Sequence, residues 1–250
     1  MGGIMNILGM NKAGLLLTLD PKFVRRSLTA EEVLYIAKTL DAFWQYDYFA
    51  AQQRRFGLHA LLKSGLHSDG FFVSKILLEH ENIRSIMARQ IIMRLEDANI
   101  AWPDYIAGIP DGATLLGERV AWILGVPEAK MKKIDGRITL ATEVPDGATL
   151  LFIEDFCTRG TGFTEAVLEV KKKNPCVEFV LCDPVIINRG GLKTVSIDGI
   201  GDFEILPVVE HRIQDWDPNV NCPLCDMGSQ AIKPKASDEN WRLVTTSQLQ

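Results

Sequence analysis

The sequence predicts an α/β fold built on parallel strands. Two segments carry this signal, because each runs from a short apolar strand through a small-residue turn into a helix, at 105–124 and at 149–173. A third apolar strand region follows at 177–187. Units of this kind place their turns at the carboxyl edge of a parallel sheet, where ligands bind.

Length and composition agree with one large α/β domain carrying an elaboration. The chain has 250 residues, of which 47% are hydrophobic and 24% charged, and no apolar run approaches the ~18 residues that a membrane span needs. A net charge of −5 disfavours a nucleic-acid surface. Five cysteines imply no disulfide framework in a chain of this size. The mildly apolar start lacks the pattern of a signal peptide, so we expect a cytoplasmic protein.

The N-terminal part, residues 1–57, is predicted to be helical. Between Ser27 and Glu32 a hydroxyl N-cap precedes two acids, and apolar residues then recur at helical spacing through Leu40. Aromatic residues between Phe43 and Phe49 continue that apolar face. We expect this part to pack against the core or against a partner subunit.

A dense polar turn lies at 61–70 and leads into Phe71 and Phe72, followed by a strand-like stretch at 73–77. Taken alone, this segment is a hairpin or a loop. A helix is predicted at 83–98 from its apolar stripe.

The next strand–turn–helix unit has a strand at 105–109, a turn at 110–113 and a helix at 114–124. The stretch 127–137 then carries four cations in eight residues and is most simply a solvated strand edge.

The most informative stretch is 149–164. An apolar strand, Leu150–Ile153, is followed by the carboxylates of Glu154 and Asp155, a turn at 158–162 and a helix from Phe163 to Lys173. The strand places both acids at the carboxyl edge, and the turn offers backbone N–H groups at a helix N-terminus, which suits a phosphate. This predicts a ligand that carries both hydroxyls and phosphate. The alternative is an ordinary strand–loop–helix with solvated acids.

The C-terminal part contains a strand at 204–209 and then a Cys-x-x-Cys pair, Cys222 and Cys225. Such a pair is half of a structural Zn²⁺ site, and the other ligands nearby in sequence are His211, Cys176 and Cys182. A symmetric dimer could also supply them. A redox role is less favoured, because the surrounding strand–helix–strand context is absent.

The stretch 149–164 resembles the binding motif for phosphoribosyl pyrophosphate (PRPP) of the type I phosphoribosyltransferases. The resemblance implies that Glu154 and Asp155 hold the ribose hydroxyls and that the turn wraps the 5-phosphate through Thr158, Arg159, Gly160, Thr161 and Gly162. Arg159 replaces a small hydroxyl residue of the motif, and Thr161 and Gly162 exchange the last two residue types.

Further segments resemble the orotate phosphoribosyltransferases in particular. The segment 61–72 implies that Lys63 contacts PRPP and that Phe71 and Phe72 flank the base. The turn 110–113 resembles a pyrophosphate loop with Asp111 and Gly112, and the cationic stretch resembles a mobile lysine loop, in which Lys133 would act on the leaving group. The resemblance also implies that Lys130 binds PRPP. It implies that Arg189 pairs with the carboxylate of orotate.

The resemblance implies a doubly wound parallel sheet with a hood from the N- and C-terminal segments, at 1–57 and 211–250, around a core at 58–210. The implied reaction transfers phosphoribosyl from PRPP to orotate or a related base with Mg²⁺, in a homodimer. The catalytic residues would be Asp155, Glu154 and Lys133. Alternatives are a PRPP-sensing module without turnover and a zinc-supported interaction protein with a relic core.

Overall fold

The computed structural model describes residues 6–249 and divides into two compact units. The first unit runs to Thr39 and resumes at Ser74–Arg212, whereas the second comprises Leu40–Val73 and Ile213–Gln250. This grouping joins the first helices to the core and joins residues 58–73 to the C-terminal segment, while the sequence-based boundaries fall at 57 and 210. Residues 1–5 and 250 of the predicted segments lie outside the described residues. Within the described range, no helix has the length and apolar character needed to cross a membrane.

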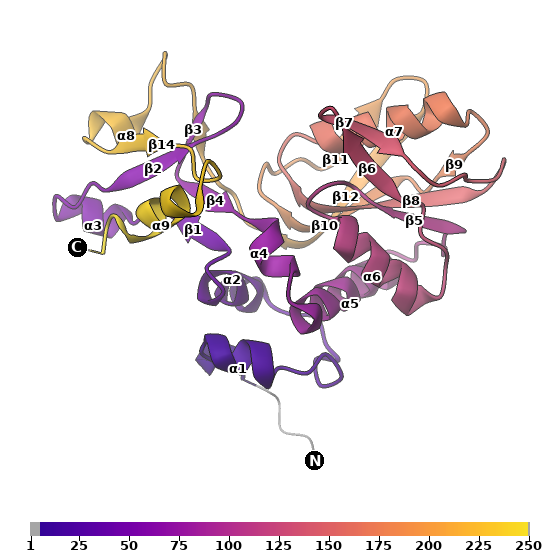
Figure 1. The fold of residues 1–250 in the computed structure, drawn as a ribbon, viewed down its shortest axis with the longest axis horizontal. Helices are drawn as coiled ribbons and strands as arrows, with labels where there is room; N and C mark the ends of the chain where they lie inside the picture. Colours follow the sequence, from indigo (N-terminus) through magenta and orange to yellow (C-terminus); the bar gives the residue numbers. More distant parts are fainter. Residues whose placement is uncertain (1–5, 250) are drawn as a thin grey trace. The chain divides into compact units, whose positions relative to one another are not determined.

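A largely parallel sheet forms the centre of the first unit (Figure 1). Its path runs β11-β12-β10-β8-β5, with β9 also paired to β8, and only β11 is antiparallel to its neighbour. Because the long strands run in one direction, their carboxyl ends share one edge. The strands are β5 (Tyr105–Gly108), β8 (Thr149–Cys157), β9 (Glu178–Phe179), β10 (Cys182–Asn188), β11 (Thr194–Ile197) and β12 (Gly201–Glu210).

Helices cover both faces of this sheet, which confirms the predicted doubly wound α/β class (Figure 1). On one face, α5 (Glu81–Asp97) contacts β10 and β12, and α6 (Thr114–Leu124) contacts β5 and β8. On the other face, α7 (Thr161–Lys173) packs with the hairpin β6 (Met131–Ile134) and β7 (Arg137–Leu140).

Aromatic packing joins α7 to its face of the sheet. Phe163 on α7 meets Phe152 on β8 with ring centroids 5.7 Å apart and meets Phe203 on β12 at 5.0 Å. All three rings are fully buried. Each buried aromatic side chain contributes a few kcal/mol of hydrophobic stabilisation, so this cluster holds the start of α7 firmly against the strand that carries the two acids.

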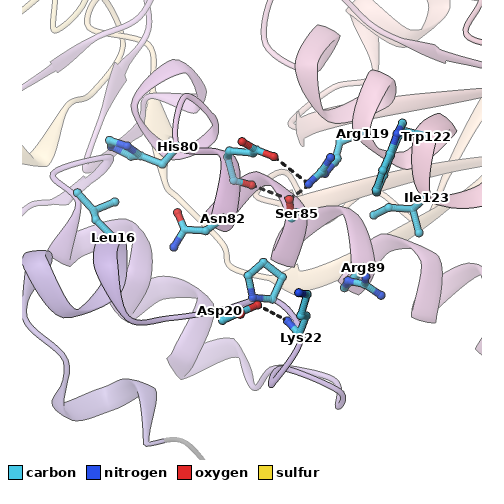
Figure 2. A pocket seen from close by; sticks show the side chains of 12 residues that line it. Leu16, Asp20, Lys22, His80, Asn82, Ser85, Arg89, Arg119, Trp122 and Ile123 are labelled. Atoms are coloured by element: carbon cyan, nitrogen blue, oxygen red, sulfur yellow. Dashed lines mark hydrogen bonds and ion pairs between the residues drawn. The ribbon is translucent and has the colours of Figure 1, made fainter.

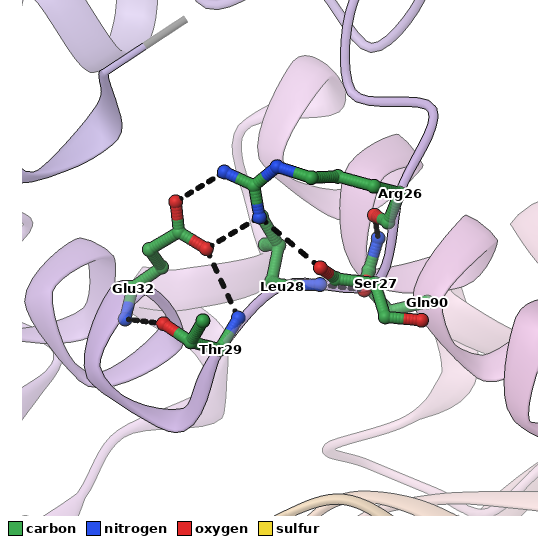
Figure 3. Close-up of polar contacts among 6 residues, drawn as sticks. All are labelled: Arg26, Ser27, Leu28, Thr29, Glu32 and Gln90. Atoms are coloured by element: carbon green, nitrogen blue, oxygen red, sulfur yellow. Dashed lines mark hydrogen bonds and ion pairs between the residues drawn. The ribbon is translucent and has the colours of Figure 1, made fainter. Parts of the chain in front are cut away.

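The N-terminal helices of the first unit are η1 (Ile7–Gly9), α1 (Lys12–Leu17) and α2 (Ala30–Thr39). Figure 3 shows how α2 begins: the Glu32 N–H donates to Thr29 Oγ1 at 3.2 Å, and the Thr29 N–H donates to Glu32 Oε2 at 3.0 Å. This reciprocal pair is a capping box, so Thr29 is the N-cap within the predicted stretch. Arg26 donates to both carboxylate oxygens of Glu32, and this ion pair lowers the Glu32 pKa.

We expect Thr29→Ala to lower the free energy of unfolding by about 1 kcal/mol, because the substitution removes the side-chain acceptor of the helix N-cap. Ser27→Ala is the matched control, since Ser27 is also an exposed hydroxyl residue two positions earlier. Urea denaturation of both variants measures the difference. Equal losses from both variants would contradict the assignment of Thr29 as the cap.

The described residues of the second unit form two small sheets and three short helices. One sheet runs β13-β3-β2-β14 and the other pairs β1 with β4. Its elements are β1 (Phe43–Gln45), α3 (Tyr48–Gln52), β2 (Leu58–Leu61), β3 (His67–Ser68), β4 (Gly70–Phe72), β13 (Asp215–Trp216), α8 (Pro223–Asp226), β14 (Gln230–Ile232) and α9 (Asp238–Thr246).

Two sequence-based predictions of secondary structure are wrong. The aromatic stretch predicted as helix contains strand β1, because Phe43 lies opposite Phe72 across the pairing with β4 and the two rings stack at 3.9 Å. The stretch predicted as strand at 73–77 is instead helix α4 (Ser74–Leu78), in which Ser74, Leu77 and Leu78 are buried. This spacing of three and four residues is helical, and tertiary packing overrides the strand-like composition.

Candidate functional site

Three loops lie at the carboxyl edge of the parallel sheet. They follow β5, β8 and β10, at 109–113, 158–160 and 189–193. The register fixes their proximity: Gly108 lies opposite Ile153, and Asn188 lies opposite Cys157. The sheet therefore gathers the predicted pyrophosphate turn, the acid pair with its phosphate turn, and Arg189 at one edge.

The acid pair lies at the end of β8 in two different environments. Glu154 is buried, with 8% of its surface exposed, whereas Asp155 is half-buried. β8 is buried without alternation from Leu150 to Glu154 and half-buried at Asp155 and Phe156, so exposure begins between the two acids. Asp155 Oδ1 accepts a hydrogen bond from the Phe156 N–H at 2.9 Å. The less buried Asp155 is therefore the acid better placed to meet a ligand.

A third acid, Asp183, lies beneath this pair and was missed by the sequence analysis. It is fully buried on β10, where Val185, two residues further along, lies opposite Glu154. Glu154, Asp183 and Cys157 offer ligand atoms within 4.8 Å of one another. The only sequence signal was an aspartate inside an otherwise apolar strand, which is a costly place for a charge.

Burial governs the ionisation of this cluster. It raises the pKa of Asp183 to about 7. It also raises the pKa of Glu154 well above its usual value, with Asp183 and Asp155 adding like-charge repulsion. The Cys157 thiol, likewise buried, has its pKa raised to about 12. Glu154 and Asp183 therefore hold a proton to a higher pH than free carboxylic acids do.

We expect the stability of the chain to fall as pH rises from 5 to 8, and Asp183→Asn to flatten this dependence. A raised pKa in the folded state means that the folded chain holds more proton than the unfolded chain between about pH 4 and the Asp183 pKa of about 7. Stability is therefore lost as pH rises through this window. Chemical denaturation at pH 5, 6, 7 and 8 checks the slope. An identical slope in the variant would contradict the assignment.

The turn after β8 presents the N-terminus of α7 to the acid pair. Gly160 is the N-cap, with a left-handed φ of 65° that favours glycine. A Cβ on Gly162 would lie 3.3 Å from Glu154 Oε1, so the first turn of the helix runs beside the acid. The first N–H groups of a helix have no partner within the helix. Thr161 and Arg159 are exposed on this turn, and Thr158 is half-buried.

The turn after β5 touches the same acid pair from the other side. A Cβ on Gly112 would lie 1.9 Å from Asp155 Oδ2, so the glycine backbone packs directly on that carboxylate. The neighbouring Asp111 is 81% exposed, and Lys133 on β6 reaches it with Nζ 3.6 Å from Asp111 Oδ2. The structure therefore brings the adjacent pair Asp111 and Gly112 together with Lys133 and Asp155, which lie further along the chain.

The predicted lysine loop is a β-hairpin. β6 and β7 pair from Met131 to Leu140 through a tight turn in which Asp135 and Gly136 both have positive φ. Lys130 precedes β6, is exposed, and its backbone N–H donates to Thr142 Oγ1 at 2.9 Å. The simpler expectation of a strand edge therefore describes this stretch, and Lys133 is the lysine that contacts a site residue.

Arg189 joins the loop after β10 to the phosphate turn. Its Nε donates to Thr158 Oγ1 at 2.5 Å, and its backbone N–H donates to the Cys157 carbonyl at 2.9 Å. A Cβ on Gly190 would lie 1.8 Å from the Thr158 carbonyl oxygen, so glycine is required for this close approach. The guanidinium thus lies beside the turn that is predicted to hold phosphate.

The remaining predicted residues for PRPP and base lie in the second unit. Lys63 is exposed in the turn between β2 and β3. Phe71 is half-buried, with the Trp241 ring centroid 6.2 Å away and Lys235 Nζ 5.7 Å from its ring. Phe72 is 2% exposed and stacks on Phe43. The burial of Phe72 favours a packing role, which leaves Phe71 as the better candidate for stacking on a base.

The cysteine pair is also in the second unit, but its neighbours differ from those expected. Cys222 and Cys225 lie beside His59 and His67, with ligand atoms within 4.8 Å of one another. The expectation of His211, Cys176 or Cys182 as partners is corrected by this cluster. Short sequence distance was a poor guide here, because the pairing of β2 with β14 brings residues near 59 and 231 together.

Figure 2 shows a separate surface pocket in the first unit, where α5 and α6 meet the segment after α1. One cation that lines it is Arg119, which donates to Ser85 Oγ at 2.8 Å, pairs with Glu81 at 3.2 Å and lies over the Trp122 ring at 4.5 Å. Since α6 starts at the carboxyl edge, its last turns lie away from that edge. The pocket therefore stands apart from the acid pair.

Comparison of sequences finds curated relatives named orotate phosphoribosyltransferase. The chain is 27% identical over 186 residues to the protein of a Nitratiruptor species, covering 70% of this chain and 90% of that protein. It is 28% identical over 178 residues to the protein of Desulforamulus reducens, covering 70% and 87%. No family model matches the chain. These relatives confirm the predicted resemblance and the prediction of a phosphoribosyltransferase enzyme.

Comparison of structures agrees at the level of the fold. The UMP synthase of Leishmania donovani aligns with a TM-score of 0.56 and 17% identity. The alignment covers 86% of this chain and 42% of that longer protein. The orotate phosphoribosyltransferase of Aeropyrum pernix aligns with a TM-score of 0.51 and 15% identity, over 71% of this chain and 93% of that one. The fold class is therefore that of the type I phosphoribosyltransferases.

Proposed function

We propose that this chain transfers phosphoribosyl from PRPP to orotate and releases pyrophosphate, with Mg²⁺ as the metal that accompanies PRPP. The observation that carries the proposal is the packing of the Gly112 backbone on Asp155, with a Cβ-to-oxygen distance of 1.9 Å if glycine were alanine. In this packing the turn would offer its backbone to pyrophosphate beside an acid that would hold ribose hydroxyls, which supports the proposal. The sequence relatives, which carry the name of this activity, add support.

Each of the three loops would hold a different part of the substrates. Asp155 would accept hydrogen bonds from the ribose hydroxyls, with buried Glu154 completing the pair. The first N–H groups of α7 and Thr158 would hold the 5-phosphate, because a helix N-terminus carries a partial positive charge. Gly112 would allow pyrophosphate to approach the backbone closely. Held in this way, the sugar is fixed in the orientation that displacement requires.

The reaction itself needs no covalent intermediate with the protein. A ring nitrogen of orotate would lose its proton to solvent or to the departing pyrophosphate and bond to C1 of the ribose. The bond from C1 to pyrophosphate breaks, and its electron pair leaves with the pyrophosphate oxygen. Positive charge develops on the sugar and negative charge on the leaving group. Lys133 is placed to meet that negative charge, since it already reaches Asp111 at 3.6 Å.

Mg²⁺ would neutralise pyrophosphate when bound with the substrate. Asp111 is the residue that fits this ion, because its carboxylate is 81% exposed beside the pyrophosphate turn and oxygen ligands suit Mg²⁺. Residues Lys130, Arg159, Thr161 and Lys63 are proposed as further contacts of PRPP. The protein is proposed to act in the cytoplasm as a homodimer, and light scattering of the purified chain checks the second point.

Arg189 is the residue on which the choice of base depends. Its planar guanidinium can form two hydrogen bonds with the carboxylate of orotate, and Phe71 is the proposed stacking partner of the ring. The contact between Arg189 and Thr158 offers a second role, in which the arginine orders the phosphate turn. The two roles make different predictions for bases that lack a carboxylate.

The experiment that tests the proposal is pyrophosphate release from PRPP and Mg²⁺ with orotate or uracil as acceptor. We expect turnover with orotate and a loss of at least about 100-fold with uracil, because uracil has no carboxylate to accept hydrogen bonds from the half-buried Arg189 guanidinium. Arg189→Met should then remove the preference for orotate. Equal rates with both bases in the parent protein would overturn the assignment of orotate. An equal fall in the rates with both bases in Arg189→Met would assign the arginine to the phosphate turn.

One observation favours a second candidate function, the binding of PRPP without turnover. The predicted lysine loop is a short hairpin formed by β6 and β7, with Asp135 and Gly136 in its turn. Its Lys133 forms an ion pair with Asp111. A segment of this kind has less freedom to follow a departing pyrophosphate than an extended loop. A sensing module predicts PRPP binding with no pyrophosphate release for any base.

A further inference from the structure

We propose that His59, His67, Cys222 and Cys225 bind one Zn²⁺ ion that fastens the two halves of the second unit together. The four side chains come from two segments far apart in sequence: the histidines from β2 and β3, and the cysteines from the N-cap and the body of α8. The proposal concerns a structural metal and does not depend on the transferase activity.

The separations that involve the cysteine sulfurs match those around a tetrahedral ion. His59 Nε2 lies 2.9 Å from His67 Nδ1, 3.7 Å from Cys222 Sγ and 3.6 Å from Cys225 Sγ, and Cys225 Sγ lies 3.3 Å from His67 Nδ1. Tetrahedral bonds of about 2.0 Å to nitrogen and 2.3 Å to sulfur place neighbouring ligand atoms roughly 3.3 to 3.8 Å apart. The two histidine nitrogens lie closer together than this, at hydrogen-bond distance, and would move slightly apart around a bound ion.

The outer partner of His59 directs the correct nitrogen to the cluster. His59 Nδ1 lies 2.9 Å from Ser229 Oγ, and that hydroxyl donates its hydrogen to the Gly57 carbonyl at 3.1 Å. Because Ser229 has already used its hydrogen, it accepts from Nδ1–H, which leaves the lone pair of Nε2 for the cluster formed with His67 and the two cysteines. Histidine ligands of metals are oriented in this way by a second hydrogen bond.

The ligand set favours zinc and a closed site. Two sulfurs and two imidazoles form a common structural zinc set, whereas Mg²⁺ and Ca²⁺ prefer oxygen ligands. Four protein ligands also leave no open position for catalysis. His59 and Cys222 are buried, and Leu224 between the cysteines is packed in the small apolar core of this unit.

A structural metal would stabilise the second unit, because its apolar core is small. Its core cluster consists of a few side chains from two short stretches of chain, and small apolar cores usually require a metal or disulfides. A zinc ion would join β2 and β3 to α8. His67 also lies four residues from both Lys63 and Phe71, so the ion would hold in place the segment that carries both.

The experiment is metal analysis of the full-length chain purified without chelator, comparing Cys225→Ser with Cys176→Ser. Both cysteines are exposed free thiols, and Cys176 lies in the first unit, so it is a matched control. We expect one zinc per chain in the parent and in Cys176→Ser, and at least a tenfold lower content in Cys225→Ser. Equal zinc in both variants, or zinc-free parent protein, would overturn the proposal.

Two further measurements keep the test independent of folding in the variant. Replacing the ion of the parent protein with Co²⁺ should produce the intense visible absorption of a tetrahedral site with thiolate ligands. Chelation should lower the thermal midpoint, and Zn²⁺, but not Mg²⁺, should restore it. A parent protein lighter by two hydrogens, with Cys222 and Cys225 joined as a disulfide, would instead assign a redox pair and overturn the zinc site.

Discussion

Asp155→Asn is expected to slow transfer from PRPP more than any other substitution considered, while leaving the fold intact. Asp155 is the half-buried acid of the pair, and its Oδ2 lies against the Gly112 backbone. An amide has nearly the same shape but loses the charge that would hold two ribose hydroxyls and balance positive charge at the sugar. We expect kcat/KM to fall by roughly 10²–10³-fold, the range for one preorganised electrostatic contact.

The control for this substitution is Asp198→Asn. Asp198 is an exposed acid in the turn between β11 and β12, and asparagine suits turns as well as aspartate does. The pair of variants therefore separates the loss of one particular charge from the loss of any surface charge. Steady-state kinetics together with circular dichroism provides the comparison, and an Asp155→Asn enzyme with near-parental kcat/KM would contradict the proposed role.

Gly112→Ala is expected to have the second largest effect. The added methyl group would lie 1.9 Å from Asp155 Oδ2 and 2.6 Å from its Cγ, which is far inside van der Waals contact. Either the turn or the carboxylate must move, and a displacement of about 1 Å at a reacting centre costs on the order of 10²-fold in rate. Steady-state kinetics should show a fall in kcat/KM of that size, without a large loss of stability.

Two other glycines provide graded controls. At Gly162 the added Cβ would lie 3.3 Å from Glu154 Oε1, so we expect a smaller loss of activity from Gly162→Ala. At Gly9 it would meet only Asn6 Nδ2 at 3.6 Å, which is ordinary contact, and Gly9→Ala should be neutral. Activity that does not follow this order would mean that close packing on the acid pair is unimportant for transfer.

The sequence was a good guide wherever local signals and tertiary structure agreed. The helix predicted at 114–124 is present with those bounds, because its apolar stripe faces the sheet and Gly125 ends it in a left-handed conformation. The strand, acids, turn and helix at 149–173 are contiguous in sequence, so their spatial order follows from the order of the chain. The resemblance then supplied roles that spacing alone does not provide.

What the sequence missed depends on contacts between distant residues. Asp183 carries no local signal of its place under Glu154, since only the register of β10 against β8 brings them together. The partners of Cys222 were sought nearby in sequence, whereas His59 is delivered by strand pairing across the second unit. The contact of Lys133 with Asp111 likewise arises from tertiary structure, and short-range periodicity contains no information on such pairs.

The most direct test of transfer is a single-turnover reaction of the parent chain with PRPP, Mg²⁺ and orotate, in which protein is in excess over PRPP. The proposed function predicts that orotidine 5-phosphate and pyrophosphate form in equal amounts and account for all the PRPP. PRPP that binds but is recovered unchanged would contradict the account and assign the chain as a sensing module. PRPP that does not bind would show that the acid pair and its turns are a relic of a phosphoribosyltransferase fold.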